Sequence, residues 1–251
     1  MTRRRWIADE VLGDTAALVG EHAAHLVRVL RAEVGQEFDI ATGDEVRCGK
    51  ITAISQDRVE FALGAERAGG VPSKSAIPQI TLVLSVFKFD RMEWAIEKCT
   101  EIGVARIVPL IARRTDVHLA TAAVKRLERW QRIARQASEQ SRRSVMAEIA
   151  GPVRLKELGN DGVLPAGATT RVVLAESLVG SDESVGLRET LQGRLTEGEV
   201  VLSVGPEGGW ADEELAMFRG SGWLAASLGE TILRAETAAI VACALAIDSL
   251  R

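Results

Sequence analysis

The chain has 251 residues, of which 47% are hydrophobic, so it can build a sizeable core and wholesale disorder is excluded. The net charge of −4 argues against a nucleic-acid partner for the molecule as a whole. The charge is uneven, however: residues 1–72 carry nine Lys/Arg against twelve Asp/Glu, a net −3, and residues 112–143 carry nine against three, a net +6. A basic segment of this kind can bind phosphates even in an acidic protein.

The N-terminus carries Arg3, Arg4 and Arg5 directly before Trp6. No apolar run follows the arginines, which argues against a secretory signal peptide. Two interpretations of this segment stay open. It is either a solvated, mobile terminus or a basic arm that binds RNA phosphates while the indole stacks on an unpaired base.

The three cysteines are isolated and form no CxxC pair, which indicates reduced, packed thiols rather than a disulfide framework or a zinc site. The most apolar segment, residues 235–250, is too short and too interrupted to cross a membrane. We therefore expect a cytoplasmic protein with no membrane contact and no metal.

Residues 21–31 have the periodicity of a short helix with an apolar side formed by Leu26, Val29 and Leu30. His25 and Arg28 lie three residues apart and share another side. That side is either simply solvated or contacts RNA. Three segments with a period near two then predict short antiparallel strands of a small barrel: residues 37–41, 47–54 and 59–63.

Gly and Pro interrupt the pattern at residues 69–73, the best domain boundary in the chain. Beyond it, residues 80–86 and 105–110 are continuously apolar, as expected for strands buried on both faces. The helix between them has a capping-box spacing at Asp90 and Glu93 and ends at Gly103. This β-α-β order predicts a parallel sheet, to which we also assign residues 172–176, 199–204 and 224–228.

Residues 124–143 predict a long amphipathic helix whose apolar stripe includes Trp130. Arg129 and Arg132 lie on a basic flank of this helix. A basic flank is usually solvated, but few acidic residues interrupt this one, which favours contact with RNA phosphates. Gln140 and Arg142 follow in the stretch EQSRR and are further candidates for RNA contact.

Two loops near the carboxyl end each follow an apolar run and lead into a helical pattern. The first is VGPEGGW, residues 204–210, and the second is LGETILRAETA, residues 228–238. Glycines and a proline directly after a strand predict tight loops whose backbone is open to a closely approaching ligand. Amides before a helix can hold a carboxylate, a phosphate or a ring acceptor. As a pair, the loops predict a pocket.

This pair of motifs resembles the last two motifs of the SPOUT-class RNA methyltransferases, in particular the branch that methylates N3 of a uridine in small-subunit ribosomal RNA. The resemblance covers nearly the whole chain. It implies an α/β fold with a PUA-like RNA-binding β-barrel in residues 1–72 and a SPOUT-type parallel sheet with a trefoil knot in residues 73–251. It also implies a homodimer.

The resemblance further implies S-adenosylmethionine as the cofactor, bound within about residues 172–251. Its expected contacts are Leu174, Glu176, Gly205, Pro206, Glu207, Gly208, Gly209, Leu228, Gly229, Ile232, Leu233, Glu236 and Thr237. Thr231 departs from the pattern, because this branch often has Arg at that position.

For catalysis, Arg234 can stabilise charge or position a phosphate, because guanidinium stays charged and donates in a fork. An ion pair with Glu236 or Glu230 is the alternative. Glu207 can act as a base, contact the cofactor or cap its loop.

The chain has no GxGxxG motif after a strand, no GxSxG and no HExxH, so a dinucleotide enzyme, a hydrolase and a metalloprotease lack support. Two alternatives to the methylation of ribosomal uridine stay open. One is a non-catalytic RNA-binding or ribosome-assembly factor, and the other is a methyltransferase acting on another RNA such as transfer RNA.

Overall fold

The computed structural model describes residues 5–43, 45–66, 79–175, 185–192 and 199–249. The chain forms two compact units: Met1–Ala76 with Ser138–Met146, and Ile77–Ala137 with Ala147–Arg251. The expected boundary at residues 69–73 lies outside the described residues. The grouping of residues 138–146 with the N-terminal unit was not anticipated from the sequence.

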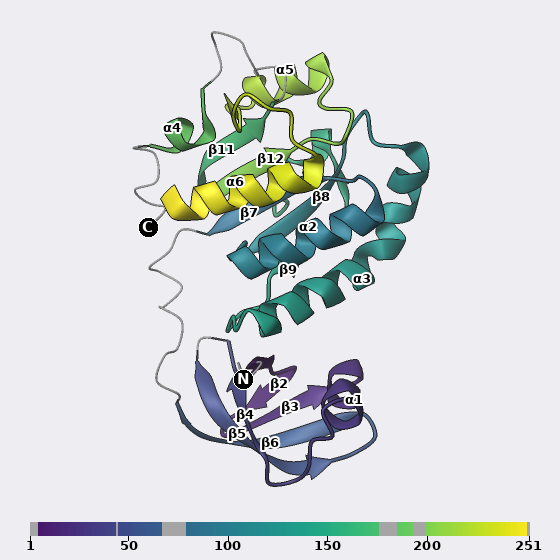
Figure 1. The fold of residues 1–251 in the computed structure, drawn as a ribbon, viewed down its shortest axis with the longest axis vertical. Helices are drawn as coiled ribbons and strands as arrows, with labels where there is room; N and C mark the ends of the chain where they lie inside the picture. The colour runs from purple at the N-terminus through teal and green to yellow at the C-terminus, as the bar shows by residue number, and fades with distance from the viewer. Residues whose placement is uncertain (1–4, 44, 67–78, 176–184, 193–198, 250–251) are drawn as a thin grey trace. The chain divides into compact units, whose positions relative to one another are not determined.

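The N-terminal unit is built on a six-stranded mixed sheet that curls into a half-barrel, with strand order β1-β4-β5-β6-β3-β2 (Figure 1). β1 and β4 pair in parallel, and the other neighbours are antiparallel. The elements are β1 (Arg5–Ile7), β2 (Glu10–Leu12), β3 (Thr15–Val19), α1 (Glu21–Arg28), β4 (Glu37–Ala41), β5 (Val46–Ile54) and β6 (Arg58–Glu66).

The core of this unit contains Trp6, Leu18, Ile40 and Phe61, all at most 1% exposed. Trp6 lies in β1, so the expectation of an indole free to stack on a base is wrong. Helix α1 ends at Arg28, three residues earlier than predicted. Of its predicted apolar side only Leu26 is buried, whereas Val29 and Leu30 are exposed.

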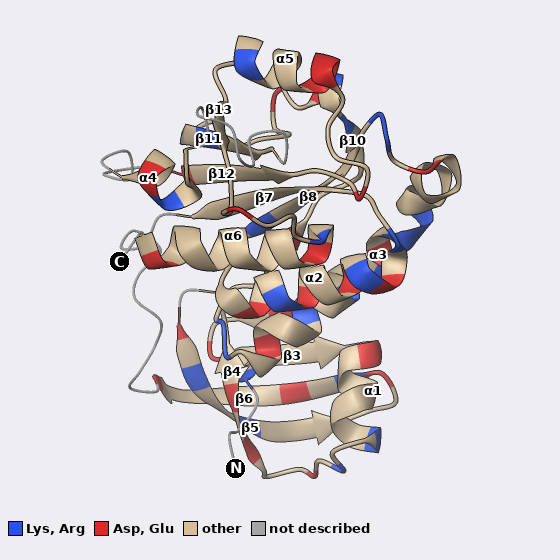
Figure 2. Ribbon diagram, turned by 45° about the horizontal axis from the view of Figure 1, so that its top comes forward, with Lys and Arg blue, Asp and Glu red and all other residues tan. Residues whose placement is uncertain are grey.

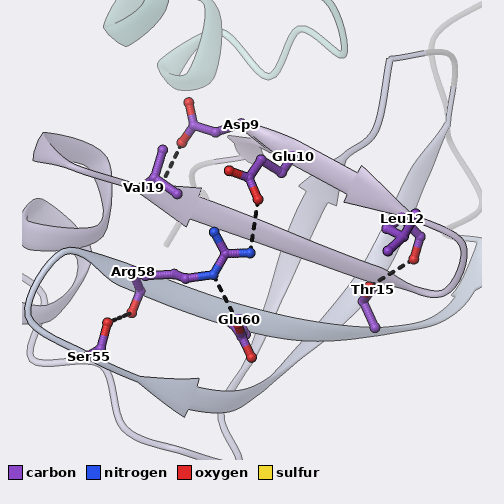
Figure 3. Close-up of polar contacts among 8 residues, drawn as sticks. All are labelled: Asp9, Glu10, Leu12, Thr15, Val19, Ser55, Arg58 and Glu60. Atoms are coloured by element: carbon purple, nitrogen blue, oxygen red, sulfur yellow. Dashed lines mark hydrogen bonds and ion pairs between the residues drawn. The ribbon is translucent and has the colours of Figure 1, made fainter.

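Charged side chains link β6 with the edge strand β2, which lies on the other side of β3 (Figure 3). Arg58 on β6 binds Glu10 of β2 and Glu60, each at 2.9 Å, and these hydrogen bonds raise the pKa of Arg58. Asp9 accepts a hydrogen bond from the Val19 amide at 2.9 Å. Polar contacts thus hold the short edge strand β2, whose own side chains are exposed.

The second unit contains a parallel sheet of seven strands in the order β10-β8-β7-β12-β11-β13, with β9 also paired to β8. The predicted parallel sheet is therefore confirmed. Its strands are β7 (Ile80–Ser85), β8 (Arg106–Ile111), β9 (Glu148–Ile149), β10 (Val153–Arg154), β11 (Ala168–Leu174), β12 (Glu199–Val204) and β13 (Leu224–Ala226). The remaining elements are α2 (Phe89–Ile102), α3 (Val117–Gln140), a 3-10 turn at Leu155–Glu157, α4 (Leu187–Leu191), α5 (Asp212–Gly220) and α6 (Ala235–Ser249).

Alternate residues of the central strands pack on opposite faces of the sheet. Leu82 and Leu84 belong to a core shared with α2, α3, α4 and α6, whereas Val83 belongs to a second core shared with α5. Both faces of the sheet are therefore covered, as its continuously apolar strands predict. The crossing of the trefoil knot stays a prediction, because residues 176–184 and 193–198 lie outside the described part.

Two helix starts differ from the predictions. Helix α3 begins at Val117 rather than at residue 124, because Asp116 accepts hydrogen bonds from the His118 and Leu119 amides and caps its first turn. Helix α2 begins at Phe89 after Lys88, so Asp90 is not its cap. The predicted end at Gly103, with φ of 124°, is confirmed. No helix in the described ranges is long and apolar enough to cross a membrane.

Candidate functional site

A pocket lies at the carboxyl ends of β11, β12 and β13, the edge at which ligands bind in open α/β sheets. Its empty space, including the opening to solvent, is about 530 Å³. The lining comes from the ends of these strands, the two glycine loops and the first turns of α6. The lining residues are Leu174, Ala175, Val204, Gly205, Pro206, Gly209, Trp210, Ala226, Ser227, Leu228, Thr231, Ile232, Leu233, Ala235 and Ala238.

The first loop turns tightly after β12. The Gly209 amide donates to the Pro206 carbonyl at 2.8 Å, and Gly209 has a φ of 68°, a conformation that disfavours any residue with a Cβ. Gly205 lies under the indole of Trp210, to which an added Cβ would approach within 3.2 Å. The backbone conformation therefore favours glycine at position 209, and packing against Trp210 favours glycine at position 205.

Residues that follow β8 hold this loop in place. Arg114 Nη1 donates to the Gly208 carbonyl at 2.8 Å. Glu214, which is 5% exposed, accepts from the Ala211 amide at 3.0 Å and from the Arg113 amide at 2.8 Å. A single buried carboxylate thus satisfies an amide at the start of α5 and an amide after β8, which fixes the loop relative to the sheet.

Trp210 connects the loop to the neighbouring strand. Its indole Nε1 donates to the Leu174 carbonyl at the end of β11, at 2.8 Å. Its ring meets Phe218 edge-on at 5.0 Å between centroids, and Phe218 meets Trp223 at 4.9 Å. The pocket wall is therefore backed by an aromatic cluster of the second core.

The second loop, residues 228–234, offers backbone groups to a ligand. Between residues 228 and 233, no backbone amide or carbonyl bonds another described group of the chain. Leu228 and Leu233 are half-buried, and Ile232 is 72% exposed although it lines the pocket. An apolar wall with unused donors and acceptors matches the composition of small-molecule sites.

Charged side chains surround the loops. Arg91 of α2 faces Glu207 at 3.9 Å and Glu236 at 3.8 Å. Arg234 is exposed, and among the described residues its guanidinium has no ion pair. Of the alternatives for Arg234 left open by the sequence, Glu236 is thus engaged by Arg91 instead, and Glu230 forms no ion pair with Arg234 within the described ranges.

The structure brings seven of the predicted cofactor contacts into the pocket lining: Leu174, Gly205, Pro206, Gly209, Leu228, Ile232 and Leu233. Others lie next to lining residues without forming the lining themselves: Glu207, Gly208, Gly229, Glu236 and Thr237. Glu176 lies outside the described residues. Sequence reasoning missed small lining residues such as Ala226 and Ser227, which carry no chemical signal. Trp210 belongs to the first loop motif, but its hydrogen bond to the Leu174 carbonyl carries no signal in the sequence.

The predicted RNA contacts are spread over both units. Arg129 binds Glu93 through both carboxylate oxygens, at 2.6 and 2.7 Å, so its charge is largely compensated within the second unit. Both acidic and basic residues lie on α2 and α3 (Figure 2). Arg132, Gln140 and Arg28 are exposed, and Arg3 and Arg4 lie outside the described residues.

In the N-terminal unit, Arg5 donates to the carbonyl of Arg142, whose own φ is 60°. The structure therefore unites two predicted RNA contacts that are 137 positions apart in the sequence. His25 is half-buried with its ring 6.0 Å from that of Trp6. Burial lowers the pKa of neighbouring Arg143 to about 10.

Comparison with known proteins defines the class. A family model described as an RNA methyltransferase domain matches residues 73–247. A ribosomal RNA small subunit methyltransferase E from Mycobacterium bovis is 32% identical over 244 residues, covering 93% of this chain and 87% of the relative. The protein of the same name from Synechocystis is 30% identical, covering 94% of this chain and 74% of the relative.

Similar solved structures belong to the same class of protein. A ribosomal RNA small subunit methyltransferase E from Neisseria gonorrhoeae, bound to S-adenosyl methionine, superposes with a TM-score of 0.78 at 29% identity over 96% of this chain and 95% of that one. A putative methyltransferase from Legionella pneumophila, in complex with the same cofactor, gives 0.81 at 28% identity over 97% and 96%. The chain belongs to the ribosomal RNA small subunit methyltransferase E family.

The bond from Trp210 to Leu174 predicts a specific loss of stability. Trp210→Phe removes the indole donor and leaves the Leu174 carbonyl without it, at a cost of about 1–3 kcal/mol. Trp223→Phe is the matched control, because that ring is equally buried at 6% and its indole bonds no described group. Urea unfolding of the two variants measures the difference, and equal stabilities would contradict the role of the bond.

Proposed function

We propose that this protein is a cytoplasmic methyltransferase that uses S-adenosylmethionine to methylate N3 of a uridine in small-subunit ribosomal RNA. Membership of the family supports the reaction. The observation that carries the proposal in this chain is the pocket between the two glycine loops, at the carboxyl edge of the parallel sheet.

The residues of the pocket fit this cofactor. Apolar side chains such as Leu174, Leu228 and Leu233 can enclose a purine, and the unused backbone groups of residues 228–233 can bind its edge. S-adenosylmethionine supplies a methyl group already activated by its sulfonium.

The chain's own residues have to orient the uridine and manage one proton. The imide nitrogen is a poor nucleophile while it is protonated, so its proton must leave or the negative charge on the ring oxygens must be stabilised. Arg234 is exposed beside the pocket and can donate to those oxygens or to a phosphate. Glu207, on the first loop, can accept the proton at a carboxylate oxygen.

RNA contact by the N-terminal unit is supported by Arg5 and Arg142, which that unit holds together. Arg28 and Gln140 are exposed in the same unit. Phosphate contacts of this kind position an RNA without reading its sequence, and each adds to the salt dependence of binding.

A homodimer is also proposed, on the strength of α6. This helix packs Ala239, Ala242 and Ala246 into the core, yet its exposed side offers little charge, with Ala244 exposed and Val241 half-buried. Such a helix favours burial against a second copy. Analytical ultracentrifugation should give twice the chain mass of 27.0 kDa.

The cofactor pocket predicts unequal effects of two matched glycine substitutions. Gly209 and Gly222 both have positive φ, 68° and 76°, so Ala strains the backbone equally at either position. Only Gly209 lines the pocket. By isothermal titration, Gly209→Ala should bind S-adenosylmethionine at least about tenfold more weakly, whereas Gly222→Ala should match the wild type. Normal binding by Gly209→Ala would remove the pocket assignment.

The activity itself is tested by methyl transfer to purified RNA. Labelled methyl should enter small-subunit ribosomal RNA or its particle as 3-methyluridine, and not transfer RNA. Arg234→Met should slow transfer by on the order of a hundredfold, and Arg219→Met, which removes another exposed arginine of this unit, should not. RNA binding without transfer would favour an assembly factor, and a methyl group on transfer RNA would favour the other alternative.

A further inference from the structure

Arg91 does not line the pocket, but its guanidinium lies near the first loop and near the start of α6. It lies in the first turn of α2, on the segment that follows β7. Its Nη1 is 3.9 Å from Glu207 Oε1, on the loop after β12, and its Nε is 3.8 Å from Glu236 Oε1, at the start of α6. One guanidinium from a third element therefore faces a carboxylate on the first loop and another in the first turn of α6, directly after the second loop.

The two carboxylates differ in how far solvent can stabilise their charge. The side chain of Glu207 is 38% exposed and can be solvated, whereas that of Glu236 is only 7% exposed. Glu236 Oε2 is buried and has no hydrogen-bond partner among the described residues. A buried carboxylate is costly without a compensating charge, and Arg91 is the cation that faces it.

The contacts are ion pairs rather than hydrogen bonds, because both distances exceed the range of a hydrogen bond. Such a contact depends on charge more than on the fork geometry of guanidinium. Pocket residues flank both carboxylates in sequence: Pro206 precedes Glu207, and Ala235 precedes Glu236. A shift of either carboxylate thus moves the pocket wall.

We propose that Arg91 is a positioning residue of the cofactor pocket, which sets the separation of the two loops by neutralising Glu207 and Glu236 together. The role in cofactor binding rests on the proposed function. The positioning itself does not, because it concerns the loops of the free protein.

The first test uses the full chain without ligand. In Arg91→Met, hydrogen exchange at the bonded amides of Gly209, Ala211 and Ala238 should accelerate several-fold relative to the wild type. Lys98→Met is the matched control: Lys98 has the same side-chain exposure of 33% on the same helix, but its partners are Glu97 and Glu101 of α2 itself. Unchanged exchange in Arg91→Met, or the same acceleration in Lys98→Met, would overturn the inference.

The second test is titration with S-adenosylmethionine. Arg91→Met should weaken binding about tenfold, equivalent to about 1.4 kcal/mol, while Arg91→Lys should stay close to the wild type because charge suffices at these distances. Adding Glu236→Gln to Arg91→Met should restore most of the affinity, since the uncompensated charge is then gone. A general loss of folding would show no such rescue.

The two measurements separate the two hypotheses. Faster exchange in Arg91→Met, together with a wild type that binds no cofactor, would refute the proposed function and leave the positioning role intact. If the wild type binds the cofactor and Arg91→Met binds it equally well, the role of Arg91 in the pocket is refuted. If Arg91→Met does not fold, Arg91→Gln, which also removes the charge, carries the same comparison.

Discussion

The parallel pairing of β12 with β7 on one side and β11 on the other is the constraint on which the site depends. Val204 pairs with Leu84 and Leu174 pairs with Ala226, so these strands end at one edge of the sheet. Loops that are far apart in sequence must therefore lie together there. The bond from Trp210 to the Leu174 carbonyl and the buried Glu214 then fix the first loop on that edge.

Much of this organisation follows from local pattern. Continuously apolar runs predicted the buried strands, and β4 and β12 have the predicted bounds. Glycines after strands predicted the pocket loops because a positive φ, as at Gly209, is a local property of the backbone. Strands β1 to β3 were missed. β1 pairs with β4 and β3 pairs with β6, both distant in the sequence, although β2 and β3 form a local hairpin. The pattern of Arg3 to Trp6 indicated a terminal arm instead.

The remainder could not be predicted because it depends on contacts between distant residues. Glu93 had the spacing of a helix cap, yet it binds Arg129, 36 positions away, and so compensates part of the basic flank that suggested an RNA surface. Residues 138–146 include the last turn of α3 but belong to the N-terminal unit, whereas the rest of this helix belongs to the second unit. Small lining residues such as Ala226 acquire their role only from the fold.

The most direct test is a crystal structure of the full chain grown with S-adenosylmethionine. The account requires the adenosyl group between residues 205–209 and residues 228–233, held by backbone groups of the second loop, with its methyl group open to solvent or RNA. Density for the cofactor elsewhere on the chain, or side chains filling this pocket while the cofactor is bound, would contradict it.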